Sequence, residues 1–161
     1  MTTISLKDFI LTGIFGRISL GMTKSEVIEY LGHPNETADF GAGNSGLFYN
    51  GFELFFWTDN DNIFAIQNDN LDELLTKKTK YKLNDKIIVD TSFLQFGQTL
   101  TYKNLIEYLT KENIKFETVD KGEYDEIKFS SGVTFDFENE EPTQQKIDRN
   151  NLKLNGIRYS E

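Results

Sequence analysis

An internal duplication is the feature that most constrains the fold. Residues 23–31 (TKSEVIEYL) align with residues 101–109 (TYKNLIEYL) at an offset of 78, and five of the nine positions are identical. Each segment is followed by a strand-like stretch with a glycine turn. Repetition at a fixed offset indicates one supersecondary unit used twice. The 161 residues therefore predict two α+β repeats, 1–78 and 79–161, packed as one compact domain.

Helix signals open each unit. Thr23 and Glu26 have the spacing of a capping box, and Gly32 marks the end of a helix predicted at 23–31. A second helix is predicted from the cap at Thr101 to about 113. A further helix is predicted around residues 6–10. Residues 68–86 are interpreted as a connector with one short helical turn.

Strand signals follow each helix. Apolar side chains alternate along 52–57 and along 133–138, which gives each strand one apolar face. The opposite faces carry Glu53, Phe55 and Trp57 in the first strand and Thr134, Asp136 and Glu138 in the second. Other strands are predicted at 37–40, 47–50, 63–67, 114–119, 127–131 and 152–159. The order in both units is a helix and then an antiparallel meander, which is an α+β arrangement.

A short motif carries a family resemblance. The segment GMTKSEV, followed by LGHP at 31–34, is similar to the signature of the small outer-membrane assembly lipoproteins of the SmpA/OmlA type. The tandem units also resemble the β-lactamase inhibitory proteins, which share that fold. The resemblance implies one continuous, curved antiparallel sheet with the helices on one face. The second unit lacks the L-G-x-P ending, and without cysteine or a recognisable signal peptide we expect no lipoprotein role.

Composition excludes several classes of function. The chain has 26 acidic against 17 basic residues and a formal charge of -9, which opposes binding to nucleic-acid phosphates. It has no cysteine, which suits a reducing cytoplasm, and no apolar run that predicts a membrane span. The single histidine, His33, leaves little acid–base chemistry near neutral pH. We therefore expect a cytoplasmic protein that is not an enzyme.

Small acidic proteins of this kind also resemble bacterial immunity proteins, which inhibit a cognate toxin. That resemblance implies an inhibitor with a protein partner and no cofactor. The predicted aromatic anchor of the binding face is Phe55 with Trp57, beside Glu53. The pattern leaves open whether these rings are exposed or lie under a loop such as 37–46.

Two acidic tracts are candidate contacts for a basic partner. Residues 59–73 have five acids and no base, a local charge of -5, and residues 117–141 have nine acids and two bases, a local charge of -7. Such tracts steer a basic partner, or they simply keep an acidic protein soluble. The candidate carboxylates are Asp59, Asp61, Asp69, Asp72, Asp136, Glu138 and Glu140.

Other sites are poorly supported by the pattern. The segment 59–62 begins like a calcium loop, but Phe64 stands where that loop needs glycine, and His33 has no second histidine to share a zinc ion. We therefore expect no metal. The alternatives are a carbohydrate or small-molecule binder that stacks on Trp57 and Tyr49, a weak hydrolase with paired carboxylates such as Glu123 and Asp125, and a homodimer.

Overall fold

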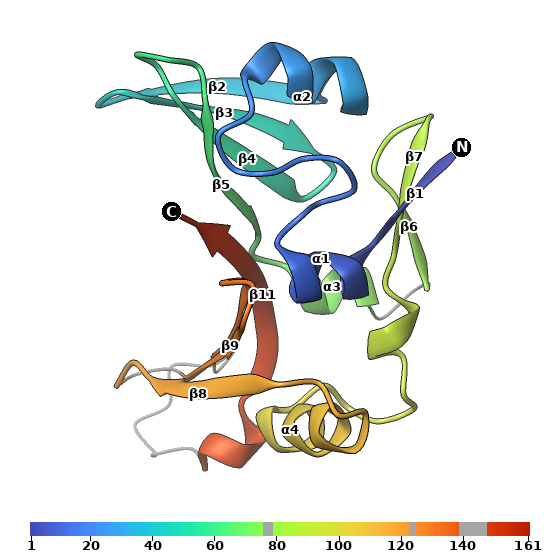
Figure 1. The fold of residues 1–161 in the computed structure, drawn as a ribbon. Helices are drawn as coiled ribbons and strands as arrows, with labels where there is room; N and C mark the ends of the chain where they lie inside the picture. Colours follow the sequence, from blue (N-terminus) through green and yellow to red (C-terminus); the bar gives the residue numbers. More distant parts are fainter. Residues whose placement is uncertain (76–78, 123–124, 139–147) are drawn as a thin grey trace.

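The structure is a computed structural model that describes residues 1–75, 79–122, 125–138 and 148–161. Runs of strands are separated by short helices along the chain (Figure 1). In chain order they are β1 (Thr2–Ser5), α1 (Leu6–Thr12), α2 (Lys24–Leu31), β2 (Glu36–Gly41), β3 (Asn44–Tyr49), β4 (Phe52–Trp57), β5 (Ile63–Asn68), α3 (Leu71–Leu75), β6 (Lys80–Lys82), β7 (Ile87–Asp90), η1 (Ser92–Leu94), α4 (Tyr102–Lys111), β8 (Phe116–Asp120), β9 (Asp125–Phe129), β10 (Thr134–Glu138), η2 (Arg149–Asn151) and β11 (Lys153–Ser160).

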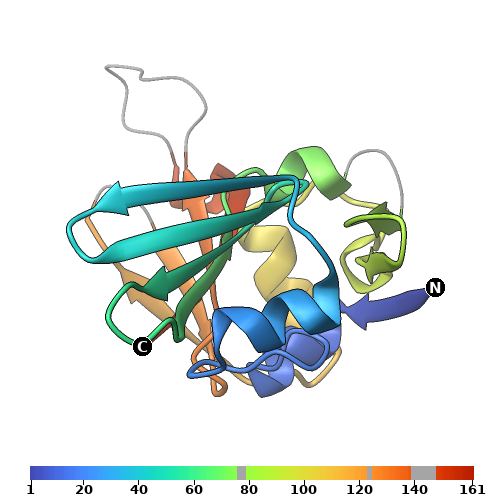
Figure 2. The same cartoon turned by 90° about the horizontal axis from the view of Figure 1, so that it is seen from above.

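An eight-stranded antiparallel sheet forms the body of the molecule, with the strand order β2-β3-β4-β5-β11-β10-β9-β8. The sheet is curved, and the helices lie on one of its faces (Figures 1 and 2). We call the other side, which no described helix covers, the outer face. The predicted α+β class with mostly antiparallel strands is confirmed.

A second sheet was not predicted. Its order is β1-β7-β6, and β1 pairs with β7 in parallel, with Thr2 opposite Ile87. The interpretation of 68–86 as a connector is thus wrong in part, because β6 lies inside it. A parallel pair between segments so distant in the sequence leaves no local signal, and β1 and β7 are only four residues long.

The helix ends follow the predicted capping chemistry. Thr23 and Glu26 form a complete capping box, and their reciprocal hydrogen bonds satisfy free N–H groups at the start of α2. Thr101 caps α4 through the N–H of Asn104. No helix among the described residues is long and apolar enough to cross a bilayer.

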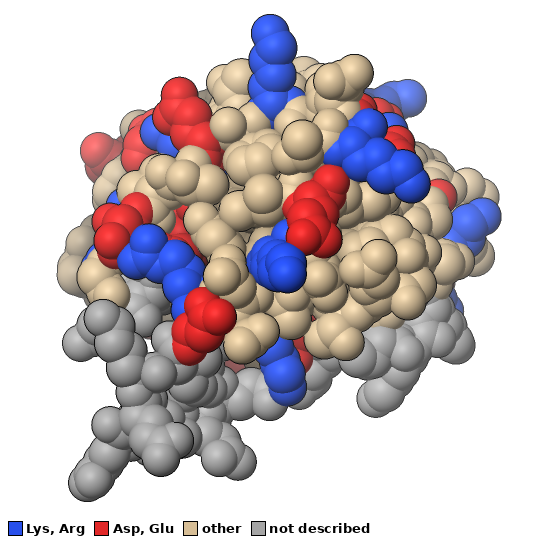
Figure 3. Space-filling view, turned by 90° about the horizontal axis from the view of Figure 1, so that it is seen from below, with Lys and Arg blue, Asp and Glu red and all other residues tan. Residues whose placement is uncertain are grey.

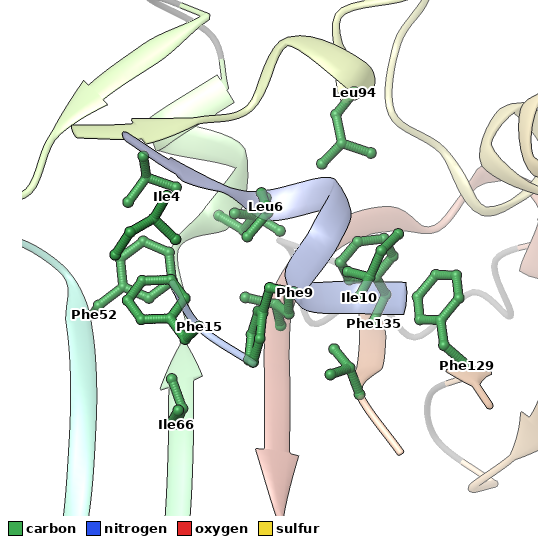
Figure 4. Packing of buried hydrophobic residues seen from close by; sticks show 14 of the residues in the cluster. Ile4, Leu6, Phe9, Ile10, Phe15, Phe52, Ile66, Leu94, Phe129 and Phe135 are labelled. Atoms are coloured by element: carbon green, nitrogen blue, oxygen red, sulfur yellow. The ribbon is translucent and has the colours of Figure 1, made fainter. Parts of the chain in front are cut away.

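Helix α1 lies at the centre of the core (Figure 4). The ring of Phe9 contacts Phe15 at a centroid distance of 5.2 Å and Tyr159 of β11 at 6.0 Å. The hydroxyl of Ser131 donates to the carbonyl of Ile10, so the β9–β10 turn is tied to the same helix. The apolar sides of β4 and β10 face this core, as predicted for Phe52 and Phe135.

Tyr49 is a buried polar residue of this core. Its side chain points to the helix-covered face, and its hydroxyl donates to the carbonyl of Gly32 at 2.8 Å. Burial raises the pKa of Tyr49 to about 12, since the phenolate would lose its hydration. The interpretation of Tyr49 as a sugar-stacking partner of Trp57 is therefore wrong, because the two rings lie on opposite faces of the sheet.

We expect Tyr49→Phe to lower the free energy of unfolding by about 1 kcal/mol near neutral pH, through loss of the hydrogen bond to Gly32. The phenol of Tyr49 has a pKa of about 12 in the folded protein and about 10 in the unfolded chain. This difference stabilises the fold fully below pH 10, and the stabilisation is lost as the pH rises through about 12. Urea unfolding at pH 7 and pH 11 tests this. The gap between wild type and variant should shrink at pH 11, and an unchanged gap would contradict the assignment.

Candidate protein-binding face

Strand β4 presents the predicted anchor residues on the outer face. Phe52, Leu54 and Phe56 are buried against the helices, so the alternate residues Glu53, Phe55 and Trp57 point the other way. Glu53 and Phe55 are half-buried and Trp57 is 39% exposed. The structure thus brings together three of the residues that the sequence marked.

Five rings from four neighbouring strands form a continuous aromatic stripe on this face. Trp57 stacks on Phe64 of β5 with centroids 4.0 Å apart and an interplanar angle of 20°. Phe64 lies 6.2 Å from Phe55, Phe55 lies 5.8 Å from Phe40 of β2, and Phe40 lies 6.3 Å from Phe48 of β3. The name aromatic stripe refers below to Trp57, Phe64, Phe55, Phe40 and Phe48.

Gly46 makes room for one end of the stripe. A Cβ atom at this position would lie 3.0 Å from Cε2 of Phe40 and 3.1 Å from Cε2 of Phe48, so the two rings converge over bare backbone. Residues 37–46 form most of the β2–β3 hairpin, which lies in the sheet beside Phe55. The alternative of a loop folded across Phe55 and Trp57 is thus wrong, and Phe40 of that hairpin is itself 49% exposed.

The register of the strands builds one row of side chains across all eight strands of the outer face. Residues that are directly opposite in neighbouring strands share a face of the sheet. In order from β2 to β8 the row is Glu36, Phe48, Glu53, Gln67, Arg158, Thr134, Lys128 and Glu117. The row is therefore aromatic and acidic toward β2, and it carries both basic residues in its other half.

A polar network fills the middle of the outer face. Arg158 contacts Asp69 (Nη2 to Oδ1, 3.1 Å) and Asp136 (Nε to Oδ2, 3.0 Å). The amide of Gln67 donates to Glu53 at 2.9 Å and to Asp69 at 3.3 Å. These contacts link β4 to β10 and hold the carboxylate of Glu53 beside the aromatic stripe.

The carboxylates predicted to contact a basic partner lie in different surroundings. Asp59 and Asp61 are exposed in the turn after β4, and Asp61 forms an ion pair with Lys24 at 3.3 Å. The N–H of Asp61 donates to the carbonyl of Trp57, so this turn lies at the end of the stripe. Asp69 is in the polar network. Asp72 of α3 lines a separate cavity of about 430 Å³ with Leu94 and Leu154, so it does not join the stripe.

The second acidic tract departs from the prediction at Asp136, which is buried. Asp136 is only 6% exposed, because it lies in the central strands with Arg158 and Asn155 as partners. Gly156 leaves the room for it, since a Cβ there would lie 3.0 Å from Oδ2 of Asp136. Glu138 ends β10, and Glu140 lies outside the described residues. Seen from below, charges of both signs are interspersed (Figure 3).

The carboxylate proposed for hydrolysis has a structural partner instead. Asp125 is buried, and its carboxylate is paired with Arg149, which also contacts Asp120 at 2.9 Å. Desolvation raises the pKa of Asp125, whereas the hydrogen bond from Arg149 lowers the pKa of Asp120. Arg149 thus ties η2 to the β8–β9 hairpin. Glu123 lies outside the described residues.

Three residues of the stripe were missed by the sequence analysis. Phe48 follows from period-two alternation, because Leu47 and Tyr49 face the core. Phe40 lies where the register of β2 and β3 shifts, between Asp39 and Gly41, so regular pairing does not place it. Phe64 has no such signal, since the register of β4 and β5 shifts between Phe55 and Phe56 and turns Phe64 outward.

The described residues form no metal site, and the chain matches no known protein in the comparisons. Among the described residues no three His, Asp or Glu side chains are grouped as metal ligands. Comparison of the chain with family models, with curated proteins and with solved structures gives no match. The arguments about function therefore rest on the outer face itself.

Proposed function

We propose that the outer face of β2–β5 binds a protein partner, and that the chain acts as an inhibitor rather than as an enzyme. The observation that carries this proposal is the aromatic stripe, five rings on a sheet face that no described helix covers. Large rigid rings that exclude water supply most of the affinity of protein interfaces. Contiguous aromatic surface of this kind is unusual on a protein that has no partner.

The partner in this proposal is a toxin with a basic surface, and the chain is its bacterial, cytoplasmic immunity protein. The acids that surround the stripe support a basic partner. Glu36 and Glu53 lie beside Phe48, and Asp59 and Asp61 follow Trp57 in the next turn. Charges around an aromatic anchor increase the rate of encounter with a partner of opposite sign.

We further propose that residues 1–78 and 79–161 are two copies of one α+β unit, as in the β-lactamase inhibitory proteins. The strand order supports this. Strands β2–β5 follow α2 and strands β8–β11 follow α4, and the last strand of each set, β5 or β11, meets the other at the centre of the sheet. In this proposal the partner contacts the two units unequally, because the stripe belongs to the first unit alone.

The experiment uses the protein encoded by the adjacent upstream gene as the candidate toxin. Co-expression should restore growth to cells that make the toxin, and the purified pair should form a stable complex. We expect Asp59→Lys to lower the association rate several-fold at low ionic strength and to leave it nearly unchanged in about 0.5 M salt, where Debye screening removes steering.

The matched control is Glu112→Lys at the end of α4, which changes the net charge equally on the helix-covered side. Equal rates for the two variants would assign the effect to net charge and remove Asp59 from the docking surface. Absence of both growth rescue and a complex would count against the immunity role.

A further inference from the structure

The charges around Phe48 indicate which kind of partner side chain would pack on its ring. Its cross-strand neighbours on the outer face are Glu36 on β2 and Glu53 on β4. Neighbouring strands are about 4.8 Å apart, so Phe48 has a glutamate opposite it on the strand at each side. A phenyl ring attracts a cation through its π face, and nearby carboxylates add to that attraction.

Neither glutamate is neutralised within the described part of the chain. Glu36 is exposed, and its carboxylate has no hydrogen-bond or ion-pair partner among the described residues. Glu53 accepts a hydrogen bond from the neutral amide of Gln67, which fixes the carboxylate and leaves its charge. The nearest base in the same row is Arg158, which is already paired with Asp69 and Asp136.

The ring itself is held in place. Phe40 meets Phe48 edge to face at an interplanar angle of 72°, and both rings rest over Gly46. A held ring loses little conformational freedom when a ligand group packs on it. The ring of Phe48 is therefore already ordered in the free protein.

We propose that Phe48, Glu36 and Glu53 form a cation seat that receives an arginine or lysine side chain of the partner. This inference rests on the proposed function and adds the chemistry of one contact to it. The guanidinium of arginine fits best, because its planar group stacks on a ring and donates to carboxylates at the same time. Lys24 already lies over the ring of Phe56 at 5.4 Å, so the fold itself uses such a pair on the opposite face.

The test uses a defined probe, the capped peptide acetyl-Gly-Arg-Gly-Arg-Gly-Arg-Gly-amide, in an NMR titration of the full chain. The amides of Glu36, Phe48 and Glu53 should shift most. The same peptide with citrulline in place of arginine keeps the shape without the charge, and it should bind at least about tenfold more weakly.

Two double variants separate the seat from the net charge of the chain. Glu36→Gln with Glu53→Gln should weaken binding of the arginine peptide by about tenfold, since both carboxylates are lost. Glu107→Gln with Glu112→Gln removes the same charge from α4 and should change binding less than about twofold. Phe48→Leu keeps an apolar side chain but loses the π face, and it should weaken binding several-fold.

Equal weakening by the two double variants, tight binding of the citrulline peptide, or shifts scattered over unrelated acids would each overturn the cation seat. The proposed function is judged separately, on the toxin complex. A complex that is lost with Trp57→Ala but indifferent to the Glu36 and Glu53 pair would keep the stripe as the docking face and remove only the seat.

Discussion

Replacing Phe9 with alanine is expected to lower the free energy of unfolding by about 3–5 kcal/mol, the largest stability effect that we predict. Phe9 is fully buried in α1 and contacts Phe15 and Tyr159. Its loss leaves a cavity between the N-terminal segment and β11. Because Phe15 in turn packs on Phe52 of β4 at 4.9 Å, the packing of both β4 and β11 depends on Phe9.

Urea unfolding followed by circular dichroism and by the fluorescence of Trp57 measures the effect. Trp57 reports on the β2–β5 end and circular dichroism on the whole chain, so coincident transitions indicate one cooperative unit. Leu11→Ala is the matched control, because Leu11 is on the same helix and 44% exposed, and it should change the free energy by less than about 0.5 kcal/mol. Two separated transitions, or equal effects of the two variants, would contradict a core shared through α1.

The parts of the fold that could be predicted are those with local chemistry. The capping box of Thr23 and Glu26, the alternation along β4 and the Asn50-Gly51 turn each follow from short-range rules, and each is present. The parallel pairing of β1 with β7 depends on contacts between distant segments, so no local pattern indicates it. The bulge that turns Phe64 outward is a property of two paired strands together.

The candidate site also has residues that local sequence patterns predict and residues whose exposure they do not predict. Glu53, Phe55 and Trp57 are found together because a single strand with period two places them. Asp136 shares that period, yet it is buried, because Arg158 and Asn155 from the neighbouring strand close over it. Alternation predicts the face on which a side chain lies. Its exposure is decided by partners on other strands, which the sequence alone does not pair.

Trp57→Ala is expected to weaken the complex with the proposed toxin partner by at least about 2 kcal/mol, or about 30-fold in Kd. Trp57 ends the aromatic stripe, stacks on Phe64 and is partly exposed, so it can bury a large area against a partner without rearranging. Isothermal titration or surface plasmon resonance measures the change. Most of it should appear in the dissociation rate, since the side chain is uncharged.

A second stacked pair of rings provides the control for this prediction. Phe96 stacks on Tyr108 of α4 with centroids 4.3 Å apart and an interplanar angle of 7°, so Phe96→Ala also breaks a stacked pair. Both variants should therefore lose a similar amount of stability, about 1 kcal/mol. Only Trp57→Ala should lose affinity, because Phe96 belongs to the helix-bearing side of the molecule. If the two variants bind the partner equally well, the aromatic stripe is not the docking face, whatever their stabilities.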